Sequence, residues 1–107
     1  MSIFSNEALA HKHILITGAT GGIGYETAKI AASMGAKITA TGRNEEKLQK
    51  LKEELLQLTD EKNLFFMPAD LADSKSREEL VAAAEEKLGF INGLVNSAGV
   101  GGGNVVE

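Results

Sequence analysis

Four short apolar segments recur along the chain, separated by longer segments that mix apolar and polar residues. The apolar segments are residues 14–16, 37–41, 64–67 and 91–95. The first is a compact aliphatic run that stops at a glycine-rich stretch, as expected of a strand buried on both faces. The third ends at Pro68, the only proline of the chain, which cannot donate a hydrogen bond to a sheet. The pattern predicts four strands.

The segment between the second and third predicted strands has the clearest helical pattern. Asn44 is a favourable N-cap residue, and Glu45 and Glu46 fall in the first turn, where the helix dipole favours acidic side chains. Leucines then recur at steps of three, four and three residues, which predicts one buried stripe and a solvated Lys/Glu-rich remainder. The members of this stripe are Leu48, Leu51, Leu55 and Leu58.

Helices are also predicted after the first and third strands. In the first of these helices Gly35 stands in the position of a C-terminal glycine. In the other, Asp73 or Ser74 can cap the start and Gly89 closes the end. The expected apolar surfaces are Ala28, Ile30, Ala31, Ala32 and Met34 on the first helix, and Leu80, Val81, Ala84 and Leu88 on the other.

Three strand–helix–strand units in series predict a parallel sheet with right-handed crossovers. The predicted fold class is α/β, a Rossmann-type three-layer sandwich of about four strands with helices on both faces. In such folds ligands bind where loops leave the carboxyl ends of the strands. Functional residues are therefore expected in the loops that follow the strands.

Length and composition limit the possible functions. At 107 residues with 43% apolar residues, the chain fits one domain that can bury a core. A net charge of −4 argues against nucleic acid as a partner, because it removes the attraction to phosphates. The absence of cysteine excludes disulfides, thiolate catalysis and cysteine-built metal sites. No apolar run reaches the length of a membrane span, and we expect a cytoplasmic protein with no membrane partner.

A glycine-rich loop follows the first predicted strand and opens the first helix. Glycines at 18, 21, 22 and 24 let the backbone turn tightly and approach a pyrophosphate, whose charge then lies at the helix N-terminus. The loop is not a P-loop, because Tyr25 and Glu26 follow Gly24 where a P-loop has lysine and then serine or threonine. The loop predicts a nucleotide or dinucleotide site, and a plain tight turn is the alternative.

Two loops resemble motifs of the short-chain dehydrogenase/reductase superfamily. Residues 17–24, TGATGGIG, resemble its TGxxxGIG fingerprint, although the string also fits the TGxxGxxG variant of the extended branch. Residues 96–99, NSAG, are similar to the NNAG motif of the reductase branch, with Ser97 in place of the second asparagine. The chain thus resembles the N-terminal, cofactor-binding part of the branch that includes 3-oxoacyl-carrier-protein reductases, and is incomplete relative to the family.

The resemblance implies a dinucleotide site at the carboxyl ends of the strands. An aspartate after the third strand contacts adenine in this family, and Asp70 stands there with Leu71 after it; the alternative for Asp70 is a turn residue. Asn96 can tie neighbouring strands, or bind the ribose, through its amide. The implied cofactor-binding residues are Gly18, Thr20, Gly21, Gly22, Ile23, Gly24, Arg43, Asp70, Leu71, Asn96, Ala98 and Gly99.

Arg43 favours NADP over NAD as the cofactor. Dinucleotide folds that prefer NAD usually place an acidic residue about 20 residues past the glycine motif, where it binds the ribose. Arg43 occupies that region here, and its guanidinium can hold a 2′-phosphate through two parallel hydrogen bonds. Against this, many NADP-dependent members carry a second basic residue before the middle glycine of the loop, where this chain has Gly21. The alternative for Arg43 is a solvated loop arginine that precedes the Asn44 cap.

The predicted organisation is a leader at 1–11, a nucleotide-binding Rossmann half at 12–103 and a C-terminal end at 104–107. In the family a Ser, a Tyr, a Lys and an Asn carry the reaction, and they lie beyond the NNAG-like loop. The resemblance implies the NADP(H)-binding portion of an oxidoreductase that transfers hydride between the cofactor and an unidentified carbonyl or alcohol substrate, inactive as this chain alone. The alternative is a non-catalytic, truncated nucleotide-binding module, or one that forms homo-oligomers through an exposed sheet edge.

Two further patterns are interpreted as structural. Tyr25 and Lys29 satisfy the family's YxxxK spacing, but they lie in the first helix, beside the pyrophosphate end of the cofactor and away from the carbon that carries the hydride. We therefore predict no catalytic residue in this chain. His11 and His13 flank Lys12 ahead of the first strand and are interpreted as surface or strand-edge residues, so that no metal site is predicted.

Overall fold

A parallel four-stranded sheet forms the centre of the protein. The computed structural model describes residues 9–19 and 21–96. Its strands lie in the order β3-β2-β1-β4, and each adjacent pair is parallel. They are β1 His13–Thr17, β2 Lys37–Ala40, β3 Leu64–Phe66 and β4 Gly93–Asn96. All four predicted strands are present, with small differences at their ends.

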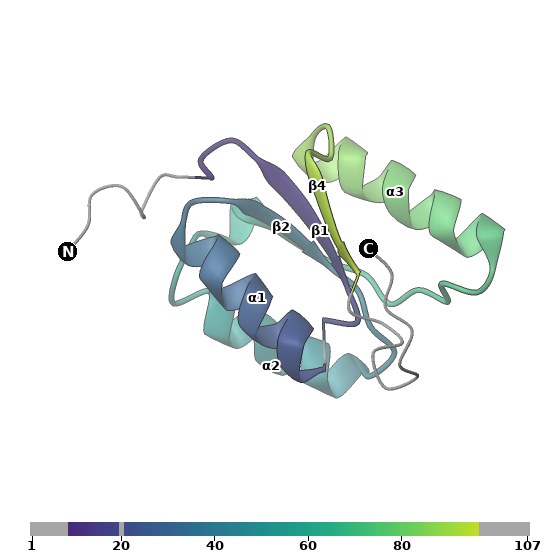
Figure 1. Cartoon of the computed structure of the whole chain (residues 1–107), viewed down its shortest axis with the longest axis horizontal. Helices are drawn as coiled ribbons and strands as arrows, with labels where there is room; N and C mark the ends of the chain where they lie inside the picture. The colour runs from purple at the N-terminus through teal and green to yellow at the C-terminus, as the bar shows by residue number, and fades with distance from the viewer. Residues whose placement is uncertain (1–8, 20, 97–107) are drawn as a thin grey trace.

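The helices lie on both faces of this sheet. They are α1 Gly22–Ser33, α2 Glu45–Leu55 and α3 Ser74–Leu88, with a short 3-10 helix, η2, at Glu61–Asn63. Helices α1 and α2 contact each other and cover one face, while α3 covers the other face and contacts β2 and β3 (Figure 1). The predicted Rossmann-type three-layer α/β sandwich is therefore confirmed.

Local sequence signals set most helix ends. The Asn44 side chain caps α2 by accepting a hydrogen bond from the Lys47 amide at 3.0 Å, as predicted. Gly35 and Gly89 follow α1 and α3 with φ of 93° and 96°, a backbone conformation that favours glycine. The Asn44 cap thus sets the start of α2, and terminal glycines follow α1 and α3. Asp73 is the N-cap residue of α3, as predicted, but its side chain makes no capping hydrogen bond.

The main core lies between the sheet and the α1–α2 layer. On the sheet side Ile16 and Ile38 are fully buried, and on α2 Leu51 and Leu55 are fully buried. Helix α1 contributes small residues, Ala28, Ala31 and Ala32, which let its backbone approach the sheet closely. On the opposite face α3 buries Leu80, Ala84 and Leu88.

Three residues predicted to be apolar contacts are exposed, and in this respect the prediction is wrong. Leu58 is exposed because α2 ends at Leu55, and the Leu58 amide then donates to the Leu55 carbonyl in a turn. Val81 is exposed because α3 turns Leu80 and Ala84 inward. Ile30 is 58% exposed because the alanines of α1 form the face that packs on the sheet.

His13 is buried in the sheet, which corrects its interpretation as a surface residue. Its ring Nε2 lies 2.7 Å from the Thr39 hydroxyl on β2, and its Nδ1 lies 2.9 Å from the Gly89 carbonyl at the end of α3. The His13 backbone amide donates to the Asn92 side-chain oxygen at 2.8 Å. The sequence gives no signal for this, because the partners are brought to His13 only by the tertiary fold.

The predicted leader falls mostly outside the described residues. Leu9, within it, packs against the core, and its amide donates to the Met34 carbonyl at 2.9 Å. Across residues 9–19 and 21–96, no helix has both the length and the apolar character needed to cross a membrane.

Candidate functional site

The described parts of the loops singled out in the sequence lie at the carboxyl ends of the strands. The first follows β1, where Gly18 has φ 65° and its carbonyl accepts a hydrogen bond from the Gly21 amide at 3.0 Å. The Ala19 amide donates to the Thr41 carbonyl at 3.0 Å and thereby fastens this loop to the end of β2. The glycine loop is thus held between β2 and the start of α1.

The N-terminus of α1 is an uncapped helix end. Its N-cap residue, Gly21, supplies no side-chain hydrogen bond, and the first turn carries no acidic residue. The first amides of a helix have no intrahelical acceptor, and those of Gly22, Ile23 and Gly24 have none elsewhere in the described part of the chain. These amides and the positive end of the helix dipole favour an anion.

Open space lies beside these amides. Among residues 9–19 and 21–96, a Cβ atom built on Gly22 would have no heavy atom within 4 Å apart from its immediate helix and chain neighbours, and one built on Gly21 would meet the Gly18 carbonyl oxygen at an ordinary 3.5 Å. Glycine at these two positions is therefore not required by crowding from the described residues. It leaves room for another molecule to approach the backbone closely.

Asn96 ties β4 to β1. The Thr17 hydroxyl donates to the Asn96 side-chain oxygen at 2.9 Å, and the Val95 carbonyl lies 3.4 Å from the same hydroxyl. Thr17 and Asn96 are register partners at the ends of the two strands. Of the two predicted roles of Asn96, the strand tie is present in the structure.

Arg43 and Asp70 line one open hollow. It has a volume of about 560 Å³ and lies at the ends of β2 and β3. Arg43 is exposed, and its guanidinium has no hydrogen-bond or ion-pair partner among residues 9–19 and 21–96. The lining residues are Gly42, Arg43, Pro68, Ala69, Asp70 and Ser76. The fold therefore brings together two of the predicted site residues that lie far apart in the sequence.

Asp70 also shapes the turn between β3 and α3. Its Oδ1 accepts a hydrogen bond from the Ala72 amide at 3.0 Å, and its own amide donates to the Ser76 hydroxyl at 3.1 Å. Leu71, which follows, is half-buried. The turn interpretation of Asp70 is thus correct, and it leaves Oδ2 without a partner in the described structure. Ser76 was not predicted, although a serine in the first turn of a helix is a usual partner for the preceding loop.

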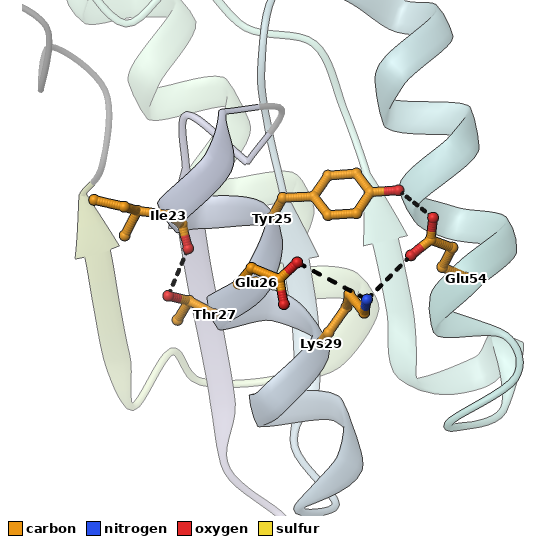
Figure 2. A network of polar contacts seen from close by, with 6 residues as sticks. All are labelled: Ile23, Tyr25, Glu26, Thr27, Lys29 and Glu54. Carbon is orange, nitrogen blue, oxygen red and sulfur yellow. Dashed lines mark hydrogen bonds and ion pairs between the residues drawn. The ribbon is translucent and has the colours of Figure 1, made fainter.

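Tyr25 and Lys29 both contact Glu54 on α2 (Figure 2). The Tyr25 hydroxyl donates to Glu54 Oε2 at 2.7 Å, and Lys29 Nζ lies 3.4 Å from Glu54 Oε1. Partial burial, followed by the hydrogen bond to Glu54, raises the pKa of Tyr25 to about 12. A tyrosine that acts as a proton donor or acceptor near neutral pH needs the opposite shift. The pair is engaged in helix packing.

Three predicted cofactor residues, Thr20, Ala98 and Gly99, lie outside the described residues. Within the described ranges, no group of three His, Asp or Glu side chains could hold a metal ion. The residues available for a ligand at this edge therefore come from the glycine loop, the end of β2, the turn after β3 and the end of β4.

Comparison with known proteins matches this chain to one family. A model described as short chain dehydrogenase matches residues 12–107. The chain is 44% identical over 92 residues to the hydroxysteroid 11-beta-dehydrogenase 1-like protein of Xenopus tropicalis, an alignment that covers 86% of this chain and 32% of the relative. The chain spans about a third of the length of the curated relatives that it matches.

Solved structures of dehydrogenases and reductases also resemble this chain. The apo-form glucose dehydrogenase of Caenorhabditis elegans superposes with a TM-score of 0.79 and 33% identity, over 90% of this chain and 39% of that one. The C-domain of a bacterial malonyl-CoA reductase, solved with NADP, superposes with a TM-score of 0.80 and 25% identity, over 90% of this chain and 16% of that one.

Proposed function

The chain belongs to the short chain dehydrogenase family, and we propose that it is the NADP(H)-binding portion of an oxidoreductase. The substrate would be a carbonyl or alcohol compound, and the reaction a hydride transfer. The observation that carries this proposal is the uncapped N-terminus of α1, at the same carboxyl end of the sheet as Arg43; neither its first amides nor the Arg43 guanidinium has a partner among the described residues.

The donor groups at this edge fit a dinucleotide phosphate. The amides of Gly22, Ile23 and Gly24 suit a pyrophosphate, because it is anionic and can approach a backbone that lacks side chains. The hollow beyond β2 and β3 would take the adenosine end, with Asp70 Oδ2 as an acceptor for the adenine amino group. Asn96 and Thr17 would hold β4 beside this site.

Arg43 supports NADP as the preferred cofactor. A 2′-phosphate carries negative charge, and Arg43 is an exposed cation with no competing acidic partner in the described structure. Its planar guanidinium can donate two parallel hydrogen bonds to phosphate oxygens. The solved relative that contains NADP, the malonyl-CoA reductase C-domain, supports the same choice.

We propose that the residues of this chain bind and orient the cofactor and that catalysis requires other groups. When bound, the nicotinamide would donate or accept the hydride. The proton carried with the substrate oxygen would need an acid or base, and Tyr25 is unsuited because its pKa is raised to about 12 and its hydroxyl is engaged by Glu54. We therefore expect no measurable turnover from this chain alone.

The substrate is proposed only at the level of its class. The relatives named above differ in the compounds that their names carry, a hydroxysteroid, glucose and malonyl-CoA. The similarity of the NSAG segment to 3-oxoacyl-carrier-protein reductases stays a prediction, because residues 97–99 lie outside the described structure.

Binding of NADPH tests the proposed function, and Gly22→Ala tests the site. By calorimetry we expect the chain to bind NADPH more tightly than NADH. Alanine at 22 places a Cβ in the space beside the α1 amides, so we expect the Kd for NADPH to rise about tenfold. The Tm should stay within about 2 °C, because this Cβ meets no other part of the described structure.

Ser33→Ala at the opposite end of α1 is the control, and it should leave the Kd unchanged. The absence of any NADPH or NADH binding by the folded wild-type chain would overturn the proposed function. If Gly22→Ala binds NADPH with the same Kd as wild type, the pyrophosphate does not bind at the N-terminus of α1.

We also propose that the chain self-associates through β4. The sheet order places β4 at an edge of the described sheet, and such an edge can pair with another chain. Leu94 on β4 is 62% exposed and Phe90, just before it, is 76% exposed, which gives this edge an apolar character. A second copy could pair with it and bury these side chains.

Sedimentation across a wide concentration range tests the self-association. We expect the average mass of wild type to rise with concentration, and Leu94→Lys to stay monomeric because a charge opposes burial at the edge. Leu58→Lys, an exposed leucine in the turn after α2, is the matched control and should associate like wild type. A strictly monomeric wild-type profile would exclude the self-association.

A further inference from the structure

Glu54 connects two helices that are distant in the sequence. One carboxylate oxygen accepts the Tyr25 hydroxyl at 2.7 Å, and the other lies 3.4 Å from Lys29 Nζ, so the two oxygens reach successive turns of α1 (Figure 2). Glu26, also on α1, lies 3.9 Å from Lys29. Within the described residues, these contacts of Glu54 are the polar side-chain links between α1 and α2.

Tyr25 belongs to the same helical turn as the anion-binding amides. It directly follows Gly24, and its backbone amide donates to the Gly21 carbonyl at 2.8 Å. Its side chain packs against the core cluster beneath α1. The packed Tyr25 ring therefore links Glu54 to the first turn of α1.

Helix α2 connects Glu54 to Arg43, at the other end of the proposed site. It begins at Glu45 with Asn44 as its N-cap, directly after Arg43. Leu48, Leu51 and Leu55 anchor this helix in the core. The orientation of α1 relative to α2 therefore acts together with the Ala19–Thr41 backbone hydrogen bond to set how the glycine-loop amides lie relative to Arg43.

We propose that Glu54 is a positioning residue for dinucleotide binding, which acts through Tyr25 and Lys29 to hold the first turn of α1 in register with Arg43. The inference rests on the proposed function, since it concerns a ligand that contacts both the α1 amides and Arg43. Glu54 itself lies outside the set of proposed ligand contacts.

The contacts of Glu54 with Tyr25 and Lys29 are better suited to positioning α1 than to stabilising the fold. The side chains of Lys29 and Glu54 are each 35% exposed, and partly exposed ion pairs contribute little to folding stability. The hydrogen bond from Tyr25 lowers the pKa of Glu54, and the pKa of Tyr25 is raised, so the contact joins a carboxylate to a protonated hydroxyl at neutral pH. Loss of the contact should therefore change ligand affinity more than the Tm.

Variants of Tyr25 and Glu54 separate these effects. We expect Tyr25→Phe and Glu54→Ala each to raise the Kd for NADPH about fivefold, with a Tm within a few degrees of wild type. Glu54→Gln keeps an acceptor oxygen for the Tyr25 hydroxyl and should recover part of the affinity. Glu61→Gln is the matched control, because it removes the 3.6 Å ion pair with Lys52 that joins α2 to η2 rather than to α1.

Adenosine 2′-monophosphate supplies a readout that general destabilisation would not give. It can reach Arg43 but has no pyrophosphate for the α1 amides, so its Kd should be the same in wild type, Tyr25→Phe and Glu54→Ala. Equal weakening of both ligands, or unchanged NADPH binding in the two variants, would overturn the positioning role. Failure of wild type to bind NADPH at all would instead overturn the proposed function.

The contact itself can be measured in solution, because Tyr25 is the only tyrosine and the chain has no tryptophan. Tyrosinate absorbance should show a pKa of about 12 in the folded chain and a lower pKa in Glu54→Ala. Because burial also raises the pKa of Tyr25, the comparison between the two proteins is decisive: equal pKa values in wild type and Glu54→Ala would show that Glu54 does not hold Tyr25, and the proposal would fail.

Discussion

Replacing Arg43 with aspartate is expected to reverse the proposed preference of this chain for NADPH over NADH. The guanidinium of Arg43 is exposed in the hollow shared with Asp70 and has no partner in the described structure. Loss of charge-assisted hydrogen bonds to a phosphate costs about 2 kcal/mol, so the Kd for NADPH should rise about 30-fold. Binding of NADH should tighten, because aspartate can accept hydrogen bonds from the ribose hydroxyls.

Calorimetry with both nucleotides at one fixed salt concentration measures this change. The Kd of Arg43→Lys for NADPH should lie between those of wild type and Arg43→Asp, because lysine keeps the charge and loses the paired hydrogen bonds. Lys62→Asp, an exposed site on η2 before β3, changes the net charge equally and should leave both affinities unaltered. Equal effects of Arg43→Asp and Lys62→Asp would assign the effect to overall charge.

The largest loss of stability is expected from truncation of the α2 core stripe. Leu51 is fully buried between α2 and the sheet, so Leu51→Ala should lower the free energy of unfolding by about 3 kcal/mol. In a small domain with a total of about 5–15 kcal/mol, this would lower the Tm by roughly 15 °C.

Urea unfolding followed by circular dichroism checks this value, and Leu58→Ala is the matched control. Leu58 continues the same leucine spacing but is 43% exposed beyond the end of α2, so its truncation should change the free energy of unfolding by less than about 0.5 kcal/mol. Similar losses in the two variants would mean that α2 extends to Leu58 in solution.

The contrast between Leu51 and Leu58 also shows what the sequence can predict about this fold. Strand and helix order follow from local signals, such as the Asn44 cap and the glycines at 35 and 89. The end of α2 does not, because the leucine spacing continues through Leu58 without a glycine or proline. There the chain leaves the helix through a turn and then approaches β3, and long-range packing decides the boundary.

The candidate site, too, could be predicted from the sequence only in part. Parallel topology is enough to predict that the loops after β2 and β3 lie together, and Arg43 and Asp70 do line one hollow. The Asp70–Ser76 hydrogen bond is a local contact between the turn after β3 and the first turn of α3. The burial of His13 instead depends on partners from elements distant in the sequence, for which the sequence has no periodic signal.

The position of β4 in the sheet has a consequence for how the protein folds. Strands β1, β2 and β3 pair with near neighbours in the chain, whereas β4 pairs with β1, and the Thr17–Asn96 hydrogen bond joins residues 79 positions apart. Closing so long a loop costs more chain entropy than closing the β1–α1–β2 and β2–α2–β3 units, and contacts of large sequence separation form slowly. We therefore expect β4 to dock last. The carboxyl end of the sheet, where the candidate site lies, would then be completed only in the final step of folding.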